Sequence, residues 1–340
     1  MNIKEYKGKI YSGKKYEDQG VLEGEASVLE ILEEIKHIPL FKLDSGDVSE
    51  FMEKGDWEKY REFLFEQVRI FEEKYPQTYE YMMYGFYALD TEGHIIFLSC
   101  WDGYEGYELE EITPNLFELR YLEFLDMQHN FIRKIPPEIA ELRNLKYLNL
   151  EWNMIREVPE TFGELENLEF LNLSKIIAEC VKGFKKFPLN LCKLKNLRVL
   201  KLEDGEISVL PEEVGELKSL RKLYLNSHQI SFLPESFGSL ESLVELNLAR
   251  NKIRNLPESF GDLKSLKYCN IVENELVELP DSIGNLVSLQ QLALGYNNLK
   301  ALPRALKNLS SLKSLDLYKN KITKVPEELS SLPNLKNIRI

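Results

Sequence analysis

Three groups of residues have types or spacings that are associated with chemistry. The segment 8–15, Gly-Lys-Ile-Tyr-Ser-Gly-Lys-Lys, is close to a phosphate-binding loop, but Lys15 stands where that loop needs Ser or Thr to hold magnesium. Cys180 and Cys192 are twelve residues apart and are predicted to be core thiols. The histidines are widely separated, without metal-ligand spacing to a cysteine or to one another; they are His37, His94, His129 and His228. We therefore predict no enzymatic activity, no metal site and no cofactor.

Composition and charge narrow the class of partner. The 340 residues include 43 Lys and Arg against 56 Asp and Glu, for a net charge of −13. Residues 1–110 hold 12 of the cations and 25 of the acids, so the rest of the chain is neutral overall. An acidic first part repels nucleic acid and anionic lipid, and a basic protein partner is one interpretation of it. The alternative is a solvated acidic surface that keeps the protein soluble. The short apolar runs predict no membrane span, and the scattered cysteines predict a reducing cytoplasm.

The elements that would position any site come from an internal repeat. Nine prolines recur at steps of 23 residues, with one step of 29, from Pro136 to Pro326. The clearest copy places Leu243, Leu246 and Leu248 before Asn251, and Pro257 nine residues after Leu248. Alternating leucines put one face of a short strand into a core, and stacked copies build a parallel sheet. A period of 23 lies within the range of solenoids.

This pattern resembles the leucine-rich repeat family, in particular the intracellular proteins of prokaryotes and the Ras-associated scaffolds. The resemblance covers about two-thirds of the chain. It implies an α/β solenoid, a horseshoe with a parallel sheet on its concave side, and adaptor or scaffold work.

Ten repeat strands are expected to start at the leucines in register, from Leu122 to Leu335, and an eleventh strand at Ile95. The asparagine that follows each strand can bond the backbone groups that a solenoid buries. Two copies depart from this pattern, with Gly205 and His228 in the asparagine position, and we interpret His228 as structural. An insertion over 174–186 accounts for the long step and maps to a loop on one face.

The N-terminal part is predicted to cap the solenoid. Residues 1–20 show no periodicity and are expected to be poorly ordered. Helical spacing predicts helices over 25–37 and 57–75, and a turn signal at 90–93 joins two strands over 84–89 and 95–99. These features predict a capping region over 21–92, with helices and a β-hairpin, followed by a solenoid over 93–340.

The strand positions that alternate with the core leucines predict a binding surface. We define the aromatic stripe as Phe97, Phe124, Tyr147, Phe170 and Val199, which occupy one position in five successive strands. A polar row accompanies it, and other aromatic residues share the broad face. An exposed apolar patch of this kind is typical of a protein-binding surface. The predicted site is Phe97, Trp101, Phe124, Asp126, Tyr147, Asn149, Trp152, Phe170, Asn172 and Tyr224. The alternative is that another segment covers the stripe, or that its rings only stack along the sheet.

We interpret the chain as a non-enzymatic interaction module that binds a protein on its concave face. Two alternatives stay open, namely the recognition arm of a larger multi-domain enzyme or GTPase-associated assembly, and a structural solenoid that assembles with itself. We expect a monomer. An end-to-end dimer is the alternative, because Ile338 and Ile340 lie in a last strand without a visible cap.

Overall fold

A computed structural model describes residues 4–6, 9–11, 19–36, 40–43, 85–100, 109–175, 183–324, 329 and 332–340. The chain forms two compact units, residues 1–154 and 155–340. The helix expected over 57–75, Trp101, Cys180 and most of the loop-like segment 8–15 lie outside the described residues. The predicted boundaries at residues 20 and 92 stay predictions.

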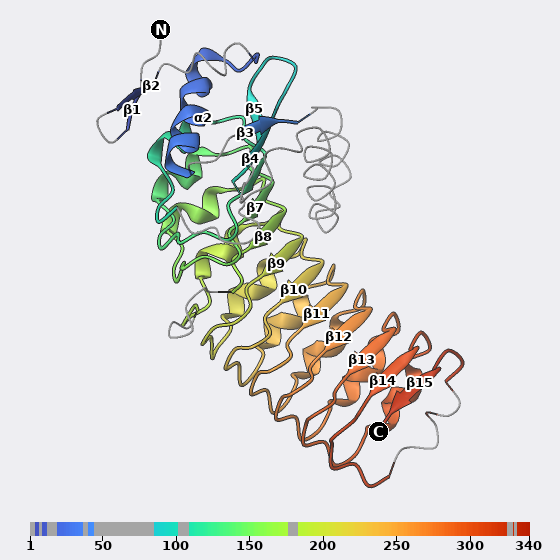
Figure 1. Ribbon diagram of the computed structural model, residues 1–340. Helices are drawn as coiled ribbons and strands as arrows, with labels where there is room; N and C mark the ends of the chain where they lie inside the picture. The colour runs from blue at the N-terminus through green and yellow to red at the C-terminus, as the bar shows by residue number, and fades with distance from the viewer. Residues whose placement is uncertain are drawn as a thin grey trace, which may run out of the picture. The chain divides into compact units, whose positions relative to one another are not determined.

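The first unit combines a helix with a mixed sheet (Figure 1). Its strands are β1 (Lys4–Tyr6), β2 (Lys9–Tyr11), β3 (Leu40–Lys42), β4 (Gly85–Leu89), β5 (Ile95–Ser99), β6 (Phe124–Asp126) and β7 (Tyr147–Asn149), and its helices are α2 (Glu23–Lys36), η1 (Pro114–Glu118) and η2 (Pro137–Glu141). The pair β1 and β2 is antiparallel, and it lies within the segment where no periodicity was found. The order β3-β4-β5-β6-β7 forms the sheet, in which β4 and β5 make the predicted antiparallel hairpin. From β5 to β7 the neighbours are parallel, so β5 is the first repeat strand, as predicted.

Helix α2 is tied to the start of β5 by one buried carboxylate. Its side chains Ala26, Val28, Leu29 and Leu32 are buried, and Glu25 is only 7% exposed. The Glu25 Oε2 atom accepts the backbone N–H of Ile95 at 2.6 Å, and its Oε1 atom lies 3.3 Å from Nδ1 of His94. Burial raises the pKa of Glu25 above its ordinary value, and these hydrogen bonds oppose the rise.

The second unit is the regular part of the repeat, with its strands stacked in chain order (Figure 1). The strands are β8 (Phe170–Asn172), β9 (Val199–Lys201), β10 (Lys222–Tyr224), β11 (Glu245–Asn247), β12 (Tyr268–Asn270), β13 (Gln291–Ala293), β14 (Ser314–Asp316) and β15 (Asn337–Arg339), and all neighbouring pairs are parallel. The 3-10 helices are η3 (Glu160–Glu164), η4 (Leu189–Lys193), η5 (Glu212–Glu216), η6 (Glu235–Ser239), η7 (Glu258–Asp262), η8 (Asp281–Asn285) and η9 (Arg304–Asn308). The repeat strands in both units lie where the leucine register places them.

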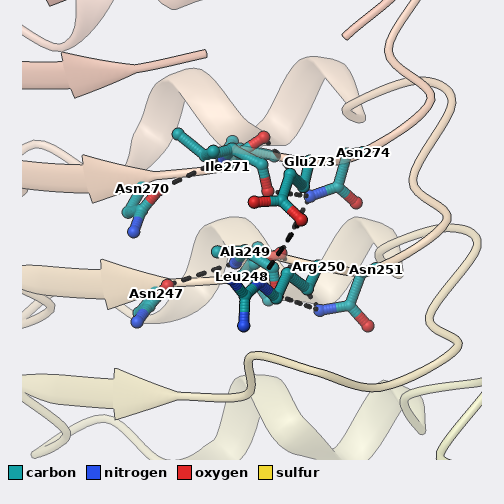
Figure 2. Close-up of polar contacts among 10 residues, drawn as sticks. Asn247, Leu248, Ala249, Arg250, Asn251, Asn270, Ile271, Glu273 and Asn274 are labelled. Carbon is teal, nitrogen blue, oxygen red and sulfur yellow. Dashed lines mark hydrogen bonds and ion pairs between the residues drawn. The ribbon is translucent and has the colours of Figure 1, made fainter. Parts of the chain in front are cut away.

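Each coil turns at a residue with positive φ that precedes the asparagine position. Arg250, for example, has a φ of 58°, and Asn251 follows it. The Asn251 Nδ2 group donates to the carbonyl of Leu248 in its own coil at 3.0 Å (Figure 2). It also donates to the carbonyl of Leu225 in the preceding coil at 2.9 Å. Its Oδ1 atom accepts the N–H of Ile230 at 3.0 Å. The amide therefore satisfies buried backbone groups of two coils, as the sequence pattern predicts.

In its coil, His228 makes hydrogen bonds equivalent to those that asparagine makes in the other coils. Its Nδ1 atom accepts the N–H of Ile207 at 3.3 Å, and its Nε2 group donates to the carbonyl of Leu202 at 2.7 Å. The ring needs more room than an amide, and Gly205 in the neighbouring coil provides it. A Cβ atom on Gly205 would lie 2.5 Å from Cε1 of the ring. The two departures from the asparagine position are thus one structural feature.

Candidate functional site

The predicted exposure of the aromatic stripe is wrong. Phe97, Phe124, Tyr147, Phe170 and Val199 are all buried, with at most 8% of any of them exposed. In the first unit, Phe97 stacks on Phe124 with 4.4 Å between ring centroids, and Phe124 stacks on Tyr147 at 4.0 Å. Rings that are stacked on both faces keep little surface for a partner. The stripe is therefore part of the packed interior of the chain.

The polar part of the predicted site is also largely inaccessible. Asp126, Asn149 and Asn172 are buried. Asp126 accepts the N–H of Gln128 at 3.0 Å and the Nδ2 group of Asn149 at 3.3 Å, so these side chains satisfy one another. Two members of the predicted site, Trp152 and Tyr224, are half-buried and keep some accessible surface. Of the described members of the predicted site, only Trp152 in the first unit and Tyr224 in the second keep accessible surface.

The accessible part of the strand face lies in the second unit. We define the strand face as the side of the sheet that carries the first and third residues of each strand. A hollow of about 420 Å³ opens on this face over β11, β12 and β13. It is lined by Glu245, Leu246, Asn247, Tyr268, Cys269, Asn270, Gln291 and Ala293. Ala293 is the third residue of β13, and its neighbours in the strand register are Asn270 and Asp316. Its small side chain projects less from the strand face than these two side chains do.

Two asparagines in the hollow are held in a fixed orientation. The Oδ1 atom of Asn247 accepts the N–H of Ala249 at 3.1 Å, and that of Asn270 accepts the N–H of Val272 at 3.1 Å. Figure 2 shows that the amide nitrogens of both side chains lie on the opposite side from these bonds. Within the described residues neither Nδ2 group has a partner. The two amides therefore present hydrogen-bond donors in register on adjacent strands.

Aromatic and charged residues surround these donors. Tyr268 is 38% exposed at the hollow, and Tyr296, which follows β13 at the position that Arg250 and Glu273 occupy in earlier coils, is 49% exposed. Lys222 pairs with Glu245 at 3.7 Å, and Arg250 pairs with Glu273 at 3.3 Å beyond the strand ends (Figure 2). Around the hollow the charges are therefore balanced, and the free groups are neutral donors and an aromatic ring.

Reactive groups are absent from this surface as far as the structure describes it. Cys269 is buried beneath the hollow, and burial raises the pKa of its thiol to about 12. Cys192 is likewise buried, and burial together with Glu213 and Glu216 raises the pKa of its thiol to about 12. Neither thiol is a nucleophile at neutral pH. Among the described residues no cluster of His, Cys, Asp and Glu is arranged to hold a metal ion, and no helix is long and apolar enough to cross a bilayer.

Comparison with known proteins agrees with the coil geometry. A family model described as leucine rich repeat matches residues 109–175, and one described as leucine-rich repeat region matches 177–267 and 246–340. The chain belongs to the leucine-rich repeat family. Domains of this family are generally protein-interaction modules, and their fold is typically non-catalytic. A search of the curated proteins finds no match to this repeat protein.

Several solved structures share the repeat fold. A leucine-rich repeat protein of Leptospira interrogans is 34% identical with a TM-score of 0.63, and the match covers 74% of this chain and 60% of that protein. The plant peptide hormone receptor RGFR1 in complex with RGF2 is 27% identical with a TM-score of 0.56, over 69% of this chain and 42% of the receptor. InlJ from Listeria monocytogenes, at 17% identity and a TM-score of 0.57, covers 72% of this chain and 53% of InlJ and shares the fold alone. This chain thus spans 60% or less of each of these proteins.

The sequence contains a signal for the residues that the predicted site missed. Asn149 and Asn172 were included because they lie between the second and third core leucines of their repeats, at the third position of their strands. The same position holds Asn247 and Asn270 in later strands, where the aromatic stripe has ended. The apolar row lies on the N-terminal strands, whereas the exposed amides lie on the later strands.

Proposed function

We propose that this repeat protein is a non-enzymatic binding module that takes an extended polypeptide segment of a partner protein on the strand face of β10–β14. The observation that carries the proposal is the pair of oriented amides of Asn247 and Asn270. Main-chain carbonyls of an extended segment are the matching acceptors, because their spacing along a strand is regular. Exposed Tyr268 supplies apolar contact beside the amides, as aromatic anchors do at interfaces.

The solved relatives support this class of ligand. The plant receptor that is similar over 69% of this chain was solved in complex with RGF2 and is named a peptide hormone receptor. Tyr224 in β10, a half-buried member of the predicted site, is kept in the proposal as a flanking contact. Adaptor or scaffold work, a monomeric state and a cytoplasmic location stay predictions. Cys192 and Cys269 are reduced and buried, which agrees with that location.

The test replaces the donors without altering the turn that holds them. In the double variant Asn247→Asp and Asn270→Asp, each remaining oxygen still accepts the same backbone N–H, while an outward donor becomes an acceptor. Asp316 already occupies this position in β14 and accepts the N–H of Tyr318 at 3.0 Å, so the coil tolerates aspartate. The matched control is Asn255→Asp with Asn285→Asp, which adds the same charge at exposed positions off the strands.

The measurement is capture of partner proteins on immobilised full-length chain, quantified by mass spectrometry. Loss of two hydrogen bonds, with repulsion added, is expected to weaken the capture of a specific partner by about tenfold. The control variant is expected to retain it. Equal capture by both double variants would exclude these amides from the interface and refute the proposal.

A further inference from the structure

Ion pairs between successive coils engage three cations in the middle of the second unit. Lys222 pairs with Glu245 at 3.7 Å, and Arg254 pairs with Glu275 at 3.0 Å. Arg250 and Glu273 form a third such pair. In each pair the acid lies one coil after the cation, so the repeat itself provides the neutralising charge.

This alternation ends after β13. Residues 300–340 hold nine Lys or Arg and only three Asp or Glu, a net charge of +6, although the whole chain carries −13. All nine cations are exposed, and none forms an ion pair with an acid in the described part of the chain. Asp316 is the single described acid in this stretch, and its Oδ1 atom is engaged by the Tyr318 N–H. Like charges that gather without partners destabilise a fold, so this region is suited to an anionic ligand.

Two of these cations, Arg339 in β15 and Lys319 just after β14, lie against the ring of Tyr318 beside the strand face. The Arg339 guanidinium lies over the ring of Tyr318, with its Cζ atom 4.2 Å from the ring centroid. Tyr296 meets Tyr318 edge-on at 5.6 Å, and the Lys319 Nζ atom lies 5.4 Å from the same ring. A guanidinium stacked on a ring keeps its N–H edge available for a carboxylate.

We propose that this strand face binds an acidic polypeptide segment, with carboxylates at Arg339 and Lys319. The inference rests on the proposed function, because the segment would continue from the hollow at Asn270 towards β15. A polypeptide is favoured over a nucleic acid or an anionic membrane. The remainder of the chain carries the opposite net charge, which repels extended polyanions. A short acidic segment meets only the local positive charge.

The test measures fluorescence anisotropy of a labelled decapeptide of alternating Glu and Ser, titrated with the full chain at about 0.15 M ionic strength. The variant is Lys319→Gln with Arg339→Gln. The control, Lys218→Gln with Lys264→Gln, removes the same charge after η5 and η7. We expect the variant to bind about tenfold more weakly, the control to bind like wild type, and Arg339→Lys to lose less than Arg339→Gln. A decapeptide with Gln in place of Glu is expected not to bind.

Three results would overturn the inference. They are no binding of the Glu peptide, equal binding of the Gln peptide, and an unchanged affinity of the Lys319 and Arg339 variant that keeps the wild-type circular dichroism spectrum. Tighter binding of a single-stranded oligonucleotide or of phosphatidylserine vesicles than of the Glu peptide would overturn the choice of polypeptide. The proposed function fails separately, through the variants of Asn247 and Asn270, because a neutral partner held by those amides needs neither cation.

Discussion

Gly205 and His228 should behave as an energetically coupled pair. A Cβ atom on Gly205 would lie 2.5 Å from Cε1 and 2.8 Å from Nδ1 of His228, and 3.0 Å from the carbonyl oxygen of Phe184. These distances are too short for a carbon atom, so Gly205→Ala must displace the buried ring or the backbone. Overpacking of this kind costs about 1–3 kcal/mol.

The single variant His228→Asn should be nearly neutral. Asn251 shows how an amide in this position accepts from the preceding coil and donates to two carbonyls, so the asparagine keeps both hydrogen bonds of the imidazole. The added bond to the carbonyl of its own coil, about 0.5–1.5 kcal/mol, offsets the packing lost beside Gly205. With the ring gone, Gly205→Ala meets only the Phe184 carbonyl at 3.0 Å. The coupling energy in the double-mutant cycle should therefore be about 1–2 kcal/mol.

The assay is urea unfolding of the four proteins, followed by circular dichroism at pH 7.5 and again at pH 5.5. Burial lowers the pKa of His228 below its ordinary value of about 6.5. The unfolded chain then takes up a proton first as the pH falls, so His228 makes the protein less stable below about pH 6.5. His228→Asn should remove this part of the pH dependence. If Gly205→Ala costs the same with His228 and with asparagine, the two positions are independent and our account of the irregular coil is incorrect.

Three further predictions concern packing between coils and the N-terminal helix. Gly238→Ala places a Cβ atom within contact of the Ser259 carbonyl, so it should lower the free energy of unfolding by about 1–3 kcal/mol in the same assay, and an unchanged urea midpoint would contradict that. Ser259→Ala should be neutral or stabilising, because the buried hydroxyl has no hydrogen-bond partner among the described residues and Ala305 occupies the equivalent position. The raised pKa of Glu25 means that the native state keeps this proton at a pH where the unfolded chain has lost it, so the free energy of unfolding falls as the pH rises. Glu25→Gln should remove this part of the pH dependence. Glu25→Ala should instead cost about 1–3 kcal/mol at all pH values by leaving the Ile95 N–H unsatisfied, and equal melting profiles for the two variants would refute this.

The repeat strands could be predicted from the sequence because each coil buries the same positions. The leucine register placed the strands, and the asparagine position placed the backbone hydrogen bonds at Asn251 and its equivalents. The residue with positive φ before each asparagine was not predicted. Side chains as different as Trp152, Asp204 and Arg250 occupy this position. The closure of the coil therefore imposes the positive φ, and the residue type does not predict it.

The candidate site was harder to predict, because a period assigns residues to rows but carries no information about what packs against a row. Phe124 and Tyr147 occupy the same strand position as Tyr268, yet they are at most 2% exposed while Tyr268 is 38% exposed. The exposure of a side chain depends on contacts between segments that are distant in sequence. The repeat pattern contains no signal that predicts these contacts. Charge can be read from the sequence more directly, because cations such as Arg250 and Arg254 pair with an acid at an offset of 23 or 21 residues, in the next coil. Where that offset holds no acid, as after Lys300, the sequence by itself identifies cations that the repeat does not neutralise. If the acidic peptide binds at Arg339 and Lys319 as proposed, missing charge partners will have identified an interaction surface in this solenoid that its apolar row did not.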